Sequence, residues 1–489
     1  MNYAVRLPDH RSVLTEESLD TVNFVAFAAL CCYLVLAIMR FQEYTWISIE
    51  APIIPVVESI MILAWMGSPK PPGLSKHLPV LLLGIVYFVS SLKAGAEYSV
   101  EITQNYFLNI AFVYVVLAQV AVDPKRADAT MAVFCTCMGV ISLQCILMSI
   151  DPNHMGWTGL QAWERLDAIP VIWQVRYIGT LGDPNDLGMT LLAAVPMSAY
   201  LMISTRSLIM KLFFLVTMGA IVYTIYLLNS RGTVLGLLAV VAVFGVLRFG
   251  IGRALLVSLV ALPLALAFSP SRLAEAGMDQ SALDRIDSWY NGMKMFANNP
   301  FFGVGKDQYT VYHRKVSHNS WIEQVAEFGM IGYLLWNRIV LGALLEAYQM
   351  VAADRRVRDA AATEIEDNAR TVRIATRDAK NSGEALPPAF EESLRTPAQD
   401  LLALIPRKEI LRSQALFLSI VGLLVSIFFI DRSDSLITFL VCAIIAGSTI
   451  RYEHQRSEID WLPVAFWVYL GAFSALVVVY TSIQIFVLA

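Results

Sequence analysis

Long apolar runs alternate with short polar segments along almost the whole chain. A helix needs about 20 mostly apolar residues to cross a bilayer. Because the runs at 78–92 and 233–247 are short, we accept eleven to thirteen of the candidates, or about 12 transmembrane helices. The pattern therefore predicts an all-α, polytopic membrane protein. The thirteen candidate runs lie near residues 21–39, 46–66, 78–92, 105–122, 129–149, 185–204, 208–228, 233–247, 254–269, 321–349, 413–430, 435–450 and 462–487.

The basic residues of the short loops orient these predicted helices, because cytoplasmic loops carry an excess of Lys and Arg. If the N-terminus is cytoplasmic, each short outside loop carries one basic residue, namely Arg40, Lys93, Arg231 or Arg432. Each short inside loop then carries two, namely Lys70 with Lys76, Lys125 with Arg126, Arg206 with Lys211, Arg248 with Arg253, and Arg451 with Arg456. We therefore expect the N-terminus inside.

This topology divides the chain into three parts. Residues 1–349 hold transmembrane helices 1–10, with outside loops at 150–184 and 270–320, and the larger loop precedes the tenth helix. Residues 350–412 form a charged cytoplasmic insert, and residues 413–489 hold the C-terminal transmembrane helices. The stretch from Ala352 to Lys380 lacks Pro and Gly and is rich in Ala, Arg and Glu, so it is predicted to continue the tenth helix into the cytoplasm.

Composition agrees with a chain that is surrounded by membrane lipids. Hydrophobic residues make up 57 % of the sequence and charged residues 16 %, whereas soluble domains carry about 25 % charged residues. The formal net charge is −4 and is spread thinly. A nucleic-acid partner is therefore not expected.

Two polar turns interrupt the apolar runs on the predicted outside face. The first runs from Arg176 to Asp186 and contains Gly179, Gly182 and Pro184. Either Asp183 or Asn185 can cap the helix that follows, but capping does not account for Arg176. The second turn is Asn229-Ser230-Arg231-Gly232. Its arginine could simply extend to the membrane interface.

The third polar segment is the long outside loop. It contains Asp284-Arg285, Trp289 and Ser317-His318-Asn319, and the tenth predicted helix follows with Glu323 and Glu327. Residues four apart share one helical face, so the two carboxylates are expected to lie together near the outer surface. The unperturbed pKa of His318 lies near neutrality, although a histidine beside a helix start can also serve as a cap. Gly303-Val304-Gly305 is too short for a nucleotide-binding fingerprint.

Taken together, these segments suggest a site for a diphosphate. Arg176, Arg231 and Arg285 can lie on one face near His318, and arginine suits a bidentate grip on phosphate oxygens. A histidine can take a proton from an acceptor hydroxyl. The sequence shows no set of metal ligands, so the arginines would stabilise the leaving diphosphate, and no metal or cofactor is predicted.

The ordered motifs resemble the O-antigen ligase/polymerase superfamily of bacterial inner-membrane glycan transferases. The resemblance covers about residues 80–345, whereas the last three helices are similar only in kind. The matching pieces are the turn from Arg176 to Asn185, Ser230-Arg231-Gly232, Asp284-Arg285 with Trp289, Pro300-Phe301-Phe302-Gly303-Val304-Gly305, and His318-Asn319 followed by Glu327-Phe328-Gly329 and Gly332.

The resemblance implies a periplasmic active site that uses an undecaprenyl-diphosphate-linked glycan donor without a metal. By this resemblance, His318 looks like the catalytic base or acceptor-orienting residue, and Arg231 and Arg285 look like the catalytic pair that binds the diphosphate. The substrate-binding positions implied are Arg176, Asn319 and Glu327. The implied location is the inner membrane of a bacterium.

The acceptor remains open among several hydroxyl compounds. If it is another lipid-linked glycan, the enzyme polymerises O-antigen or exopolysaccharide repeat units; if it is lipid A core or a protein, the enzyme is a ligase. The insert at 350–412 is larger than a simple ligase needs and could bind polysaccharide-assembly proteins, which favours the polymerase. The alternative from another class is a polysaccharide or lipid transporter or flippase, but the sequence shows no internal repeat.

Overall fold

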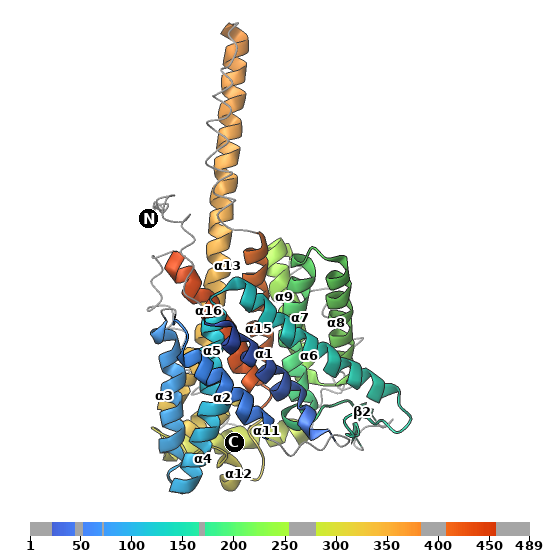
Figure 1. Cartoon of the computed structure of the whole chain (residues 1–489), viewed down its shortest axis with the longest axis vertical. Coiled ribbons are helices and arrows are strands. Elements are labelled where there is room, and N and C mark those ends of the chain that lie inside the picture. The colour runs from blue at the N-terminus through green and yellow to red at the C-terminus, as the bar shows by residue number, and fades with distance from the viewer. Residues whose placement is uncertain are drawn as a thin grey trace, which may run out of the picture.

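A computed structural model describes residues 22–44, 52–70, 73–165, 172–253, 280–382 and 407–455 (Figure 1). Within these ranges the fold is helical apart from one two-stranded antiparallel hairpin. The main elements are α1 (Phe24–Met39), α2 (Ile53–Met66), α3 (Leu74–Ser91), α4 (Ala96–Tyr106), the π-helical turn η2 (Phe107–Ala111), α5 (Phe112–Val120), α6 (Pro124–Ile150), β1 (Trp163–Arg165), β2 (Ile172–Gln174), α7 (Pro184–Ser204), α8 (Leu208–Leu227), α9 (Arg231–Phe249), α11 (Gln280–Asn298), α12 (Tyr309–Tyr312), α13 (Ser320–Ser382), α15 (Arg407–Ile427) and α16 (Leu436–Gln455).

The helices confirm the predicted all-α, polytopic membrane fold. In the described part of the chain, eight helices are long and apolar enough to cross a membrane, and α2, α3 and α16 provide shorter apolar helices. Eleven of the thirteen predicted apolar runs overlap these helices. The runs predicted at 254–269 and 462–487 lie outside the described residues.

One helix was not expected from the sequence. The predicted outside loop at 270–320 contains α11, whose Trp289, Met293 and Phe296 pack in one cluster with residues of α13. These apolar residues recur every three or four positions, which is the spacing of one helical face. Because polar residues separate them, they do not form the continuous apolar run by which the membrane helices were identified.

The longest helix, α13, is interrupted at the point where another segment packs against its backbone. Gly329 has φ 64° and ψ −165° and interrupts the helical backbone. The segment 300–305 pairs with this break: the N–H groups of Val304 and Gly305 donate to the carbonyls of Ala326 and Glu327, at 3.0 and 2.9 Å. In return the N–H of residue 330 donates to the carbonyl of residue 300 at 2.8 Å. The backbone groups released by the break are thus satisfied inside the protein, as a low-dielectric environment requires.

Beyond the break, α13 continues past the bundle as a long projecting helix (Figure 1). The predicted helical continuation is observed and reaches Ser382. From Arg356 to Ser382 it extends roughly 40 Å at 1.5 Å per residue. We call the end from which it projects the projecting end. The opposite end, which carries α11, α12 and the hairpin in Figure 1, is called the loop end.

Buried ion pairs fasten the projecting end. Asp128 of α6 accepts hydrogen bonds from Arg412 of α15 at 2.8 Å and from Tyr200 of α7 at 2.7 Å. Beside them, the Ser413 hydroxyl donates to Asp354 of α13 at 2.7 Å. The last segment of α13 inside the bundle is therefore tied directly to the start of α15.

The break in α13 leads to a prediction about the stability of the folded protein. A Cβ atom added at Gly329 would lie 2.4 Å from the carbonyl carbon of Phe301, and the positive φ disfavours any side chain. We expect Gly329→Ala to lower the free energy of unfolding by roughly 2 kcal/mol or more, measured as a lower melting temperature of the purified protein. The control is Gly219→Ala in α8, where an added Cβ has no heavy atom within 4 Å. Equal melting temperatures for the two variants would contradict the structural role of the break.

Candidate active site at the loop end

His318 lies where four distant segments of the chain meet. Its pKa is lowered from the ordinary value chiefly by burial; the Asp431 carboxylate opposes this, the Arg285 guanidinium lowers the pKa further, and Asp183 again opposes. His318 has φ 48°, a left-handed conformation that non-glycine residues rarely adopt. His318 therefore lies within electrostatic range of Arg285, as expected from the sequence, and its imidazole is neutral near pH 7.

The position of Arg285 follows from the way α11 is fastened to the segment before α13. The Trp289 indole N–H donates to the Ser317 carbonyl at 2.9 Å, and the Ser288 hydroxyl donates to the Val316 carbonyl at 2.8 Å. Arg285 and Trp289 are four residues apart and share one face of the helix. Arg285 is therefore on the face of α11 that packs against the segment before His318, and its charge acts on the imidazole.

Arg231 is placed at the same end by a series of hydrogen bonds that cap helices α7 and α9. Asp183 caps α7 by accepting from the N–H of Asn185 at 2.7 Å, which confirms the predicted cap. The Asn185 side-chain oxygen accepts from the Ser230 hydroxyl at 2.7 Å, and Ser230 caps α9 by accepting from the N–H of Thr233 at 3.3 Å. Arg231 is the first residue of α9, and its Nε atom is buried. The two polar turns of the sequence are thus joined directly.

The loop between α15 and α16 completes the site, and sequence reasoning did not assign it a role. The Ser320 hydroxyl donates to the Ile430 carbonyl at 2.7 Å and accepts from the N–H of Arg432 at 3.0 Å. Arg432 in turn forms an ion pair with Asp186 of α7 at 2.6 Å. These contacts hold Asp431 opposite His318, and burial raises the pKa of its carboxyl. A run of charges between two apolar segments, Asp431-Arg432-Ser433-Asp434, was the available signal.

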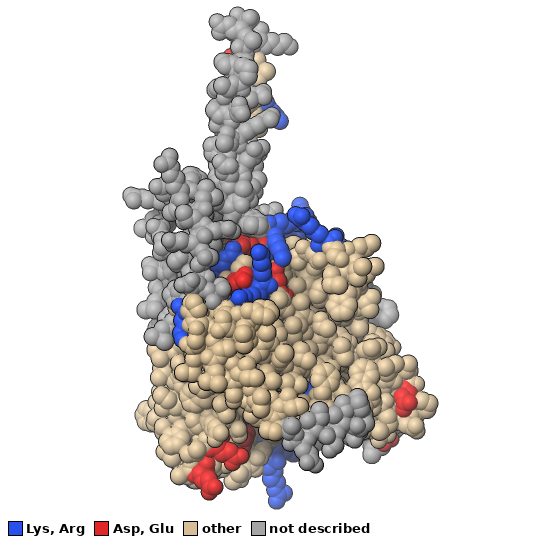
Figure 2. Space-filling view, in the orientation of Figure 1, with Lys and Arg blue, Asp and Glu red and all other residues tan. Residues whose placement is uncertain are grey.

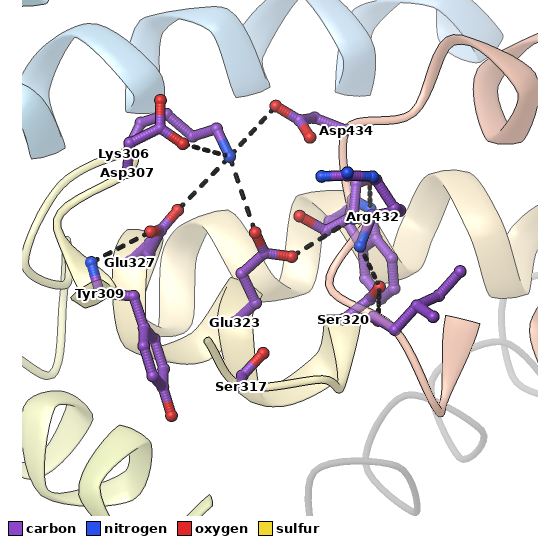
Figure 3. Close-up of polar contacts among 12 residues, drawn as sticks. Lys306, Asp307, Tyr309, Ser317, Ser320, Glu323, Glu327, Arg432 and Asp434 are labelled. Atoms are coloured by element: carbon purple, nitrogen blue, oxygen red, sulfur yellow. Dashed lines mark hydrogen bonds and ion pairs between the residues drawn. The ribbon is translucent and has the colours of Figure 1, made fainter. Parts of the chain in front are cut away.

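A buried lysine anchors the segment before α12 against α13 (Figure 3). The Lys306 ammonium lies 3.1 Å from Asp307, 3.3 Å from Asp434, and 3.7 Å from both Glu323 and Glu327. Burial opposes the charged form, but the carboxylates raise the pKa of Lys306 well above its ordinary value, so it stays charged. The predicted shared face of Glu323 and Glu327 is confirmed.

Two of the predicted substrate-binding residues have structural partners. Glu327 is buried, lies beside Lys306 and accepts from the N–H of Tyr309 at 3.3 Å. Asn319 is buried, and its side-chain oxygen caps α13 by accepting from the N–H groups of Trp321 and Ile322 at 2.9 and 3.2 Å. Asn319 therefore shapes the turn that carries His318, whereas Glu327 holds the segment of Lys306 and Tyr309.

Arg176 lies on the hairpin and is not brought to His318 by the contacts observed. Its Nε donates to the Gln161 carbonyl at 2.8 Å, and its guanidinium lies 5.8 Å from the ring centre of Trp163. The hairpin itself is joined to the turn before Arg231, because the Gln174 amide donates to the carbonyls of residues 228 and 229 at 2.8 and 3.2 Å.

The carboxylates of this end are engaged with cations of the chain itself. Lys306 and Arg432 take up most of the acidic side chains described above. Among the residues that the structure describes, no group of three or more His, Cys, Asp or Glu side chains could hold a metal ion.

The electrostatics of His318 can be measured directly. Because a positive neighbour disfavours the imidazolium, Arg285→Gln is expected to raise the pKa of His318; because a negative neighbour favours it, Asp431→Asn is expected to lower it. Histidine titration by NMR in detergent micelles checks both signs, with His313 as an internal reference. Shifts of the same sign in the two variants would show that these charges do not face His318.

Comparison with known proteins gives one family. A protein-family model described as O-antigen ligase matches residues 212–337. No curated protein matches the chain. The matched segment contains Arg231, Arg285, His318 and Lys306, whereas Arg176 and Asp431 lie outside it. The match supports the resemblance indicated by the motifs: residues 212–337 are similar to O-antigen ligase, as expected for the O-antigen ligase/polymerase superfamily.

Proposed function

We propose that this membrane enzyme transfers a saccharide from undecaprenyl diphosphate to an acceptor hydroxyl at the periplasmic face. The observation that carries the proposal is the meeting of His318 and Arg285 at the end where α9 begins with Arg231. The O-antigen ligase match favours a transferase over a polysaccharide or lipid flippase. The catalytic residues proposed are the three predicted from the sequence.

Arg231 and Arg285 would bind the diphosphate of the donor. Each guanidinium presents a planar fork that matches two phosphate oxygens, and it remains charged at all physiological pH values. Helices α7, α9 and α13 all begin at the loop end. Their N-termini carry partial positive charge, so they add favourable potential for an anion without adding side-chain charge. Together these groups would stabilise the charge that develops on the departing diphosphate.

His318 would take the proton from the acceptor. As the acceptor oxygen bonds to the anomeric carbon of the donor saccharide, the bond between that carbon and the diphosphate oxygen breaks. The hydroxyl proton passes to the imidazole, and undecaprenyl diphosphate leaves with the electron pair. A histidine with a lowered pKa is neutral at the start of this step, as a general base must be.

The orientation in the membrane follows from the basic residues. Lys and Arg gather around the root of the projecting helix (Figure 2), where Lys408 and Arg412 bind Asp128 and Arg451 binds Glu409. By the positive-inside rule this end faces the cytoplasm. The loop end, and with it the proposed active site, would then face the periplasm.

The acceptor proposed is a second lipid-linked glycan, which makes the enzyme a polymerase of O-antigen or exopolysaccharide. The projecting helix provides a charged surface outside the bundle for polysaccharide-assembly proteins. A ligase that uses lipid A core or a protein as acceptor is the second candidate, because the matching family model is described as O-antigen ligase.

The first test removes the proposed base. We expect His318→Ala to abolish transfer by the purified protein in lipid nanodiscs supplied with a lipid-linked glycan, while its melting temperature stays close to that of the parent. Products that lengthen by repeat units identify a polymerase, whereas a single addition to lipid A core identifies a ligase. The matched control is His313→Ala, which changes a half-buried histidine of the same loop. Undiminished transfer by the His318 variant would refute its assignment as the base.

The second test addresses the diphosphate. Arg231→Lys and Arg285→Lys keep the charge but lose the planar fork, so each should reduce kcat/KM by roughly tenfold or more. The exposed Arg314, substituted in the same way, serves as control and should have little effect. Parent activity in both Lys variants would leave these arginines a generic charge role, which contradicts bidentate binding.

A further inference from the structure

The hairpin at the loop end carries an exposed indole on the face that points toward Arg231. In the antiparallel pair of β1 and β2, Trp163 lies directly opposite Gln174. Side chains of directly opposite residues project from the same face of a sheet. The Gln174 amide donates to the carbonyls of Leu228 and Asn229, which lie three and two residues before Arg231. Trp163 therefore belongs to the hairpin face that meets the turn carrying Arg231.

The two tryptophans of the hairpin have different surroundings. Trp173 projects from the opposite face and stacks on His154, with ring centres 4.3 Å apart. The Trp163 side chain is 48 % exposed, and the Arg176 guanidinium lies beside its ring. The Nε atom of Arg176 is fixed on the Gln161 carbonyl, so this arginine braces the indole, and a guanidinium has further N–H groups that can donate to a ligand.

The described residues on both sides of the hairpin are tied to neighbouring segments. The Tyr177 hydroxyl donates to the Met39 carbonyl at 2.8 Å and lies 2.6 Å from the Tyr44 hydroxyl. The Gln144 amide donates to the Thr158 hydroxyl at 3.0 Å. A surface fixed in this way loses little conformational entropy when it binds a ligand.

We propose that Trp163, braced by Arg176, is a saccharide-binding platform beside the diphosphate site. A pyranose ring presents a face of C–H groups that packs on an indole, while its hydroxyls accept hydrogen bonds such as those from a guanidinium. The proposal rests on the proposed function, because it gives Arg176 and Trp163 the glycan of that reaction as ligand. In this proposal Arg176 positions the Trp163 ring and does not bind the diphosphate. The competing role for an exposed tryptophan at this end is membrane-interface anchoring.

The experiment measures saccharide binding and transfer separately. The probe is the lipid-free oligosaccharide released from the host's own lipid-linked glycan, titrated calorimetrically into protein in nanodiscs. Trp163→Ala should weaken binding roughly tenfold, whereas Trp163→Phe, which keeps a ring face, should stay within about threefold of the parent. Arg176→Gln should give an intermediate loss. The control is Tyr312→Ala, which changes another exposed aromatic residue of the same end, on α12.

Kinetics identify which saccharide the platform holds. If it binds the donor, Trp163→Ala raises the KM for the lipid-linked donor with little change in kcat; if it binds the acceptor, the KM for the acceptor rises instead. Unchanged oligosaccharide affinity and unchanged KM values, with or without lower stability in the membrane, would overturn the platform and support anchoring. Oligosaccharide binding that depends on Trp163 in a protein without transfer activity would support the platform and refute the proposed function.

Discussion

The break in α13 at Gly329 and the backbone hydrogen bonds that fill it are the constraint on which the loop end depends. A helix interrupted near a bilayer exposes N–H and C=O groups that lipid cannot satisfy, so another segment must reach them. Here the segment 300–305 does so, and its own path is thereby fixed. Because Lys306 follows immediately, the same pairing delivers an ammonium to the face of α13 that carries two glutamates. The turn that bears His318 rests on this assembly.

Most of the buried charges described at the loop end lie beside a residue of opposite charge. Lys306 is surrounded by carboxylates, and Arg432 is paired with Asp186. Removing one member of such a buried set costs several kcal/mol, about 3–5, because its partners remain charged. The arrangement fixes the loop between α15 and α16 against α7 and α13. It therefore places Asp431 beside His318 without requiring that either residue be part of a regular element.

The membrane helices could be predicted because a helix that crosses the bilayer must be apolar over its whole length, and such apolar runs can be recognised in the sequence. The capping role of Asp183 and the shared face of Glu323 and Glu327 could also be predicted, since both depend on residues close in sequence. Contacts between residues that are far apart in the sequence could not be predicted. Lys306 pairs with Asp434, 128 positions later, and nothing in the local sequence of either residue identifies the other as its partner. Helix α11 was missed because its apolar face shows periodicity without a continuous run. Arg176 was grouped with the other arginines by residue type, whereas the fold gives it the hairpin as its partner.

The tie between Asp354 and Ser413 has an evolutionary consequence. It joins α13 and α15 through two buried side chains, so the chain between these two residues begins and ends at one fixed point. The part of α13 from Arg356 to Ser382 projects beyond the bundle and lies outside its helix packing. Segments of different length and composition can be exchanged there between related proteins while the remainder of the molecule keeps its register. New partners could thus be acquired without altering the chemistry at the opposite end.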